Sequence, residues 1–113
     1  SDGCQKAVAI LGYEAAYMEN GKLGLESWEK ENYELIFTDC QMPVMDGYEM
    51  ARLIREKEMK KNIIQPVPII ALTANAMQHE SDRCYKAGMN DVICKPCTIA
   101  NLREKISQWH TAK

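Results

Sequence analysis

Three short apolar runs, each closed by a polar residue, constrain the fold of this chain more than any other feature. The runs cover residues 33–38, 68–72 and 91–94. The residues that close them are Asp39, Thr73 and Lys95. Continuous apolar runs of this length are typical of strands buried on both faces, as in a parallel sheet. Helical patterns lie between the runs, so the sequence predicts an open α/β sheet with right-handed crossovers.

Helix and strand signals surround the first of these runs. Asp46 is an N-cap candidate for a helix over residues 47–57, and Glu49 completes a capping box. A short helix is expected around residues 25–28. A weaker strand signal covers residues 14–18.

Two further helices follow the second and third runs. The helix over residues 77–87 is polar and has the thinnest apolar face, so we expect it to be the most loosely packed. Gly88 ends it, and Thr98 caps the last helix. The apolar stripe of that last helix consists of Ile99, Leu102, Ile106 and Trp109.

Composition narrows the class of protein. The chain has 113 residues, of which 46% are hydrophobic and 27% charged, the mixture of one globular domain over residues 1–113. Its 14 basic and 16 acidic residues give a net charge of -2, so we expect no nucleic-acid partner. No apolar run approaches the ~20 residues that cross a bilayer, and direct membrane contact is not expected. Five cysteines cannot all pair, which favours reduced thiols in the cytoplasm.

The polar residues that close the runs define a candidate site. In open α/β sheets, sites form at the carboxyl ends of the strands, so these residues are expected to meet at one edge. There, Asp39 would act as a nucleophile that forms an acyl phosphate. The hydroxyl of Thr73 would donate a hydrogen bond to a phosphoryl oxygen, and the charge of Lys95 would offset negative charge that builds up during transfer.

Longer segments around these residues resemble those of two-component receiver domains. Residues 37–47 resemble the phosphoacceptor segment, residues 71–77 the threonine segment and residues 87–96 the lysine segment. The pairing of the first two segments is most similar to receivers of hybrid sensor histidine kinases. The resemblance implies a flavodoxin-like fold, an open parallel sheet of order 2-1-3-4-5 with helices on both faces.

The resemblance also implies partners, a cofactor and a location. A histidine kinase domain would supply the phosphoryl group to Asp39 in a transfer that the receiver itself catalyses, and a histidine phosphotransfer domain would receive it. Mg²⁺ would bridge carboxylate and phosphate, with Asp39 and the backbone carbonyl of Gln41 as ligands. The chain would be cytoplasmic, on its own or as the cytoplasmic part of a membrane-anchored sensor kinase.

The chain departs from the family at two places. Val92 occupies the position of an aromatic switch residue that many receivers carry, so signalling through a rotating aromatic ring is not expected. The family's first strand, which ends in two adjacent acids that help hold Mg²⁺, has no counterpart, and residues 5–11 resemble the end of the first helix. We therefore expect an N-terminally incomplete receiver that lacks strand 1 and binds Mg²⁺ poorly.

Three explanations for the missing strand remain open. The strand lies upstream in the natural protein, or a second copy of the chain lends one. In the third explanation, residues 14–18 pair directly with residues 35–38 in a sheet of four strands. The first is favoured, because the rest of the chain fits the family so closely.

Two other functions are alternatives to phosphotransfer. A receiver-like docking module that binds its partner without phosphorylation fits the missing acids, and two acids at the end of an upstream strand would argue against it. Cys94 and Cys97 have the CxxC spacing of thiol oxidoreductases, but such motifs begin a helix after an early strand, and this one follows the last strand. Cys40, Cys84 and Cys94 are instead expected to be small core residues.

Overall fold

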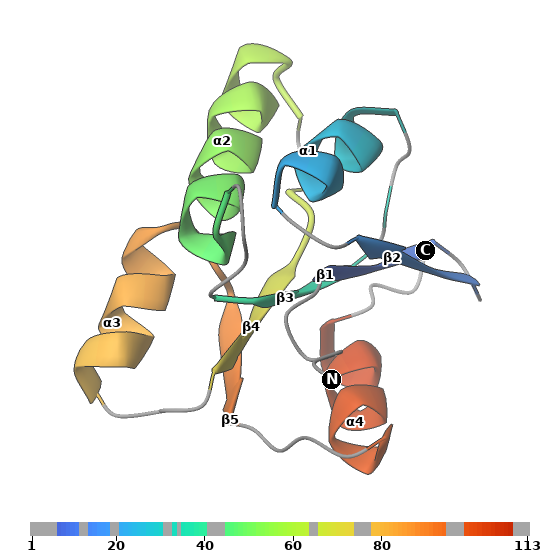
Figure 1. Cartoon of the computed structure of the whole chain (residues 1–113), viewed down its shortest axis with the longest axis vertical. Helices are drawn as coiled ribbons and strands as arrows, with labels where there is room; N and C mark the ends of the chain where they lie inside the picture. The colour runs from blue at the N-terminus through green and yellow to red at the C-terminus, as the bar shows by residue number, and fades with distance from the viewer. Residues whose placement is uncertain are drawn as a thin grey trace.

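One open sheet forms the centre of the molecule (Figure 1). Its strands are β1 (Ala7–Leu11), β2 (Glu14–Met18), β3 (Leu35–Asp39), β4 (Ile69–Thr73) and β5 (Asp91–Cys94), in the order β2-β1-β3-β4-β5. The helices are α1 (Gly21–Lys30), α2 (Gly47–Lys60), α3 (Gln78–Lys86) and α4 (Ile99–Trp109). The computed structural model describes residues 7–11, 14–18, 21–30, 33, 35–40, 45–63, 66–73, 78–94 and 99–109.

The predicted flavodoxin-like class and strand order are confirmed, but the expectation of a parallel sheet holds only for β3, β4 and β5, because β1 is antiparallel to both of its neighbours. β3, β4 and β5 are parallel, with Asp39 opposite Leu72 and Thr73 opposite Cys94. Each predicted apolar run became one of these strands, and each strand ends within one residue of its predicted end. The parallel half of the sheet therefore follows from local sequence pattern.

The position expected to be empty is occupied. β1 lies between β2 and β3 and is antiparallel to both, with Ala9 opposite Ala16 in one ladder and Ile36 in the other. The expectations that residues 5–11 end a helix and that this chain has no strand at this place are thus wrong for Ala7–Leu11, and so is the four-stranded sheet. The physical reason is backbone pairing: β3 is buried, and its amide and carbonyl groups need partners on both sides, which outweighs the helix preference of alanine.

The two faces of the sheet have separate cores. Alternate residues of a strand point to opposite faces, so Ile36 lies with α1, α2 and α3, whereas Leu35 and Phe37 lie with α4. Figure 1 shows α1 and α2 on one side of the sheet and α4 on the other. The side chains of α4 that pack against the second core are Leu102, Ile106 and Trp109, three of the four residues of the predicted stripe. The side chain of Ile99 lies outside the described residues.

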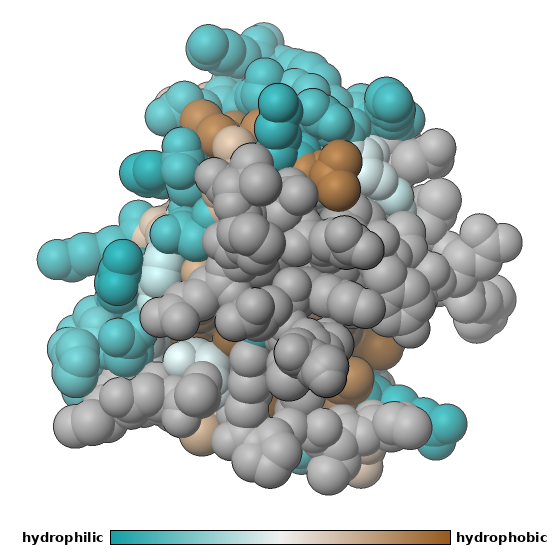
Figure 2. All heavy atoms as spheres, in the orientation of Figure 1, coloured by the Kyte–Doolittle hydropathy of each residue, from teal (hydrophilic) through white to brown (hydrophobic). Residues whose placement is uncertain are grey.

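The helix expected to be the most loosely packed has one buried residue. α3 buries Cys84 alone among its residues, and Gly88 ends it with a φ of 104°, as predicted. Among the described side chains of α4, those that contact its core are half-buried, so loose packing is not special to α3. Figure 2 shows mainly hydrophilic side chains over α2 and α3.

Hydrogen bonds around the Arg55–Glu58 ion pair of α2 join this helix to the amino end of β4. Glu58 is 4% exposed and accepts hydrogen bonds from Arg55 Nη1 and from the Val67 amide, both at 2.8 Å. Arg55 Nη2 donates to Asn90 Oδ1 at 2.7 Å, and the same oxygen accepts from the Ile69 amide at 2.8 Å. These bonds satisfy a buried carboxylate and hold β4 in place, so they support the strand whose other end carries Thr73.

Candidate functional site

Two of the predicted site residues lie at the carboxyl edge of the sheet. Asp39 is the last residue of β3 and is 4% exposed, and Thr73 is the last residue of β4 and is 7% exposed. Asp39 is opposite Leu72 in the ladder, so Thr73 is one residue beyond the partner of Asp39 on the neighbouring strand. The parallel register thus brings a carboxylate and a hydroxyl to one edge, as the sequence predicted.

The other two predicted site residues, Lys95 and Gln41, lie outside the described residues. Cys94 is the ladder partner of Thr73, and Lys95 is the next residue in the sequence. The Thr98 cap also lies outside them.

The amino end of α2 lies directly against the end of β3. The Gly47 amide donates to the Cys40 carbonyl at 3.0 Å, and the Cys40 amide donates to the Leu72 carbonyl at 3.4 Å. A Cβ atom at Gly47 would stand 2.4 Å from the Asp39 carbonyl oxygen, so position 47 has no room for a side chain. The amino end of α2 is therefore held directly against the strand end that carries Asp39.

A second glycine brings α1 to the same place. The Gly21 amide donates to the Met45 carbonyl at 2.9 Å, and a Cβ atom at Gly21 would stand 2.4 Å from that oxygen. Asp46 caps α2 as predicted, with its carboxylate accepting from the Glu49 amide at 2.9 Å. Sequence reasoning identified the cap but missed the close approach at Gly21, for which a glycine before a helical pattern is only a weak signal.

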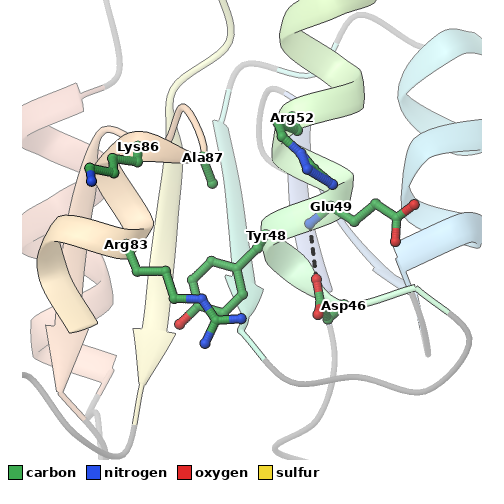
Figure 3. Close-up of a pocket in the computed structure, with 7 residues that line it drawn as sticks. All are labelled: Asp46, Tyr48, Glu49, Arg52, Arg83, Lys86 and Ala87. Atoms are coloured by element: carbon green, nitrogen blue, oxygen red, sulfur yellow. Dashed lines mark hydrogen bonds between the residues drawn. The ribbon is translucent and has the colours of Figure 1, made fainter. Parts of the chain in front are cut away.

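Tyr48 is the most prominent residue that the sequence analysis overlooked. It lies on the first turn of α2, is 9% exposed, and donates a hydrogen bond to Glu80 Oε1 of α3 at 2.8 Å. The guanidinium of Arg83 lies 4.1 Å from the centre of its ring. Figure 3 shows the two side chains against each other, from α3 and α2. Tyr48 therefore joins α2 to α3 close to Asp39. Val92, on β5, does not provide this link.

An open hollow of about 310 Å³ lies beside this link (Figure 3). Its lining consists of Asp46, Tyr48, Glu49, Arg52, Arg83, Lys86 and Ala87. Three cationic and two anionic side chains mix there, so its electrostatic character is nearly balanced.

Two buried side chains, those of Cys40 and Tyr48, lie near Asp39. Burial raises the pKa of the Cys40 thiol to about 12, and the charge of Asp39 is among the smaller contributions in the same direction. Burial is also the main reason why the pKa of the Tyr48 phenol is raised. Both groups are thus protonated at neutral pH and serve as neutral neighbours of the carboxylate.

The burial of the cysteines differs in part from the prediction. Cys40 and Cys84 are buried as expected, but Cys94 is exposed, because it is the last residue of the edge strand β5. Cys97 lies outside the described residues, so the CxxC spacing is not tested as a site.

The described residues do not form a complete Mg²⁺ site. In that part of the chain, no group of three or more His, Cys, Asp or Glu residues could hold a metal ion. Asp39 supplies one carboxylate at the edge, and Mg²⁺ typically takes one or two carboxylates with phosphate and water. The donor set found in this structure therefore falls short of the pair that the resemblance calls for.

No helix within the described residues is long and apolar enough to cross a membrane.

Comparison with known proteins gives concordant matches. The family model described as "Response regulator receiver domain" matches residues 1–107. Hybrid signal transduction histidine kinase K of Dictyostelium discoideum is 42% identical over 104 residues, which cover 89% of this chain and 9% of the kinase. The chain spans less than a tenth of the length of the curated relatives it matches.

Two solved structures are similar in fold and sequence. The co-crystal structure of the Saccharomyces cerevisiae histidine phosphotransfer protein Ypd1 with the receiver domain of the response regulator Ssk1 matches with a TM-score of 0.78 and 34% identity, over 82% of this chain and 68% of that chain. The receiver domain of sensor histidine kinase PA1611 from Pseudomonas aeruginosa, with magnesium in its active-site cleft, matches with a TM-score of 0.71 and 40% identity, over 84% of this chain and 75% of that chain.

Proposed function

This chain belongs to the response regulator receiver domain family, and on that premise we propose that it accepts a phosphoryl group on Asp39 in a two-component phosphorelay. The observation that carries the proposal is the placement of Asp39 and Thr73 at the carboxyl ends of neighbouring parallel strands, 4% and 7% exposed. A buried carboxylate at this edge is suited to hold a reactive acyl phosphate away from bulk water.

The proposed transfer uses the side chains in distinct roles. An Asp39 carboxylate oxygen attacks phosphorus, and the bond from phosphorus to the donor's histidine nitrogen breaks, with the electron pair leaving on nitrogen. The Thr73 hydroxyl donates a hydrogen bond to a phosphoryl oxygen. The ammonium of Lys95, which follows the ladder partner of Thr73, offsets charge on another phosphoryl oxygen.

The proposed partners are a histidine kinase domain as donor and a histidine phosphotransfer domain as acceptor. Two findings support them: the curated relatives are hybrid histidine kinases, and the Ssk1 receiver was crystallised with a histidine phosphotransfer protein. A cytoplasmic location belongs to the same proposal, because buried reduced thiols such as those of Cys40 and Cys84 are typical of a reducing compartment.

Mg²⁺ binding is proposed to be weak in this chain. Asp39 and the Gln41 carbonyl remain the predicted ligands, and one carboxylate neutralises only part of the charge of the ion. Titration calorimetry with MgCl₂ should give a dissociation constant in the millimolar range or weaker. Sub-millimolar affinity would show that further ligands complete the site.

The same shortage of carboxylates supports a second candidate function. In that alternative, the chain is a docking module whose edge and helices bind a partner without phosphorylation. The two functions predict different results for the Asp39→Asn variant and a phosphorylated partner. A docking module still binds that partner, whereas a receiver whose binding depends on phosphorylation of Asp39 does not.

Phosphorylation of Asp39 is tested by intact mass after incubation with acetyl phosphate or a phosphorylated histidine phosphotransfer protein, with MgCl₂ present. We expect one added phosphoryl group that hydroxylamine removes, and none in Asp39→Asn. Asp82→Asn is the matched control, because Asp82 is an exposed aspartate of α3. Equal labelling of Asp39→Asn would place the phosphoryl group on another residue and end the assignment.

A further inference from the structure

Two buried thiols meet between the phosphoacceptor strand and α3. The sulfur atoms of Cys40 and Cys84 are 3.7 Å apart, although the residues are 44 positions apart in the sequence. Cys40 is 4% exposed and Cys84 is 0% exposed. The contact therefore exists only because the sheet and α3 are packed together.

The pair connects two elements that matter to the proposed site. Cys40 directly follows Asp39 at the end of β3, and Cys84 is the buried residue of α3. The phenol of Tyr48, which itself links α2 to α3, is close enough to both thiols to affect their pKa values. Within the described residues no group of three or more ligands forms a metal site, so the pair is not half of a metal centre there.

We propose that Cys40 and Cys84 form a reversible disulfide that ties α3 to the end of β3 and makes this receiver responsive to thiol oxidants. The sulfur atoms need only close from 3.7 Å to the ~2.05 Å of a disulfide bond. A small shift of α3 is enough, because α3 buries only Cys84, and its contacts to Tyr48 are made by the side chains of Glu80 and Arg83, which can follow the movement.

The oxidation is a two-electron step. With hydrogen peroxide, one thiolate attacks an oxygen atom, the O–O bond breaks and hydroxide leaves, and the other thiolate then attacks the sulfur of the sulfenic acid and displaces a second hydroxide. With diamide, one thiolate adds to the N=N bond, and the other thiolate attacks that sulfur and displaces the hydrazine. With hydrogen peroxide as the cellular class of oxidant, the two thiol hydrogens and two electrons end in two molecules of water. With diamide as the laboratory probe, they end on the two nitrogens of a hydrazine.

Access to the pair depends on α3. Cys40 is 4% exposed and Cys84 is 0% exposed, so an oxidant hardly reaches either sulfur in the closed protein and the reaction is slow. Local opening of the loosely anchored α3 exposes the thiols, and reclosing brings the sulfurs together. Cys94 is exposed and reacts before the buried pair, so the two reactions can be followed separately.

The disulfide has a functional consequence, and this part rests on the proposed phosphorylation of Asp39. A bond from residue 40 to α3 limits how far α3 can move when a phosphoryl group arrives at residue 39. Phosphoryl uptake in the oxidised protein is therefore expected to be slower by at least a few-fold, and to recover when a reductant cleaves the bond.

Peptide mapping tests the disulfide directly. The folded chain is treated with diamide, remaining thiols are blocked with N-ethylmaleimide, and the protein is digested with trypsin. Cys40 then lies in the peptide of residues 31–52, Cys84 in that of residues 84–86, and Cys94 with Cys97 in that of residues 87–103. The expected product is the first peptide linked to the second, in monomeric protein, and absent after reduction.

Variants and a second measurement complete the test. Cys94→Ser should keep the link, whereas Cys84→Ser and Cys40→Ala should lose it. The oxidised wild-type chain should melt at least ~5 °C higher than the reduced chain, because the cross-link closes a long loop. The wild-type map decides the question even if a variant folds poorly.

Three outcomes would overturn the proposal: residues 31–52 and 84–86 stay unlinked after Cys94 has reacted, the link forms only in urea, or Cys40 is found joined to another cysteine. In each of these cases, the contact between Cys40 and Cys84 is not a redox pair of the folded protein. If the link forms but the reduced protein takes up no phosphoryl group, the disulfide stands and the proposed phosphorylation fails, so the two results are distinguishable.

Discussion

Gly47 and Asp39 are in backbone contact: a Cβ atom at position 47 would lie 2.4 Å from the Asp39 carbonyl oxygen and 3.1 Å from Thr38 Oγ1. The Thr38 hydroxyl in turn donates to the same Asp39 carbonyl at 3.0 Å. The start of α2 and the end of β3 therefore form one rigid unit, and the position of the Asp39 carboxylate depends on a residue that has no side chain.

Gly47→Ala should destabilise the protein, although alanine is the better helix former. The new methyl group overlaps a backbone atom, which cannot move aside like the end of a flexible side chain, so we expect a loss of about 1–3 kcal/mol in chemical denaturation. Glu56→Ala, at an exposed site of the same helix, is the control and should change stability little. Unchanged or increased stability of Gly47→Ala would contradict the contact.

Tyr48→Phe should weaken the link between α2 and α3. The substitution keeps the buried ring but removes the hydrogen bond to Glu80 Oε1, with an expected loss of about 1–2 kcal/mol in urea denaturation. Tyr85→Phe is the matched control, because Tyr85 is 49% exposed, and it should cost less than about 0.5 kcal/mol. Similar effects of the two substitutions would mean that the phenol of Tyr48 makes no useful bond.

Asp91 should make stability depend on pH in the acid range. Burial acts to raise its pKa, but hydrogen bonds from Lys105, Trp109 and the Val92 amide outweigh burial and lower it from the usual 3.8. A carboxylate with a lowered pKa in the folded state stabilises the fold above pH 3.8, and this contribution disappears as the pH falls through the folded-state pKa.

Asp91→Asn should therefore lose stability near neutral pH and show a smaller further loss in acid than the wild type. Thermal melts between pH 7 and about pH 2.5 measure both. Parallel stability curves for the two proteins would show that the bonds to α4 leave the pKa of Asp91 unchanged.

Amide hydrogen exchange should be faster in α3 than in α2. α3 buries only Cys84, whereas α2 buries Gly47, Tyr48, Met50, Ala51, Ile54 and Glu58. Fewer buried contacts mean a lower free energy of local opening. Mass spectrometry of peptides from residues 78–86 and 47–60 compares the two, and equal protection would argue against α3 as the mobile element.

Lys95→Ala should slow phosphotransfer far more than it destabilises the fold. Loss of one charge contact to the transferring group commonly costs ~10²–10³ in rate. Lys60→Ala, an exposed lysine of α2, serves as control. Unchanged phosphotransfer with a much lower melting temperature would make Lys95 a structural residue.

Much of the fold could be predicted because its signals are local. The run that became β5 matched its strand residue for residue, and Asp46 was identified as the cap of α2 from residue type and spacing alone. Asp39 and Thr73 were placed at strand ends by the same argument, since parallel strands bring their carboxyl ends to one edge.

The rest depended on contacts between distant segments. Residues 7–11 read as helical by themselves, but they form β1, because pairing with β2 and β3 satisfies backbone groups that a local pattern does not reveal. Likewise, Cys94 was expected in the core, yet β5 is the edge strand and leaves it exposed.

The sequence by itself thus determined the α/β class, the parallel strands and the residues at their ends, because period, caps and turns are properties of a few neighbouring residues. Only the tertiary structure decided the direction of β1, the bond from Tyr48 to Glu80 and the meeting of Cys40 with Cys84. Each of these contacts joins residues that are distant in the sequence and that no local pattern relates. The close packing of the whole domain brings them together.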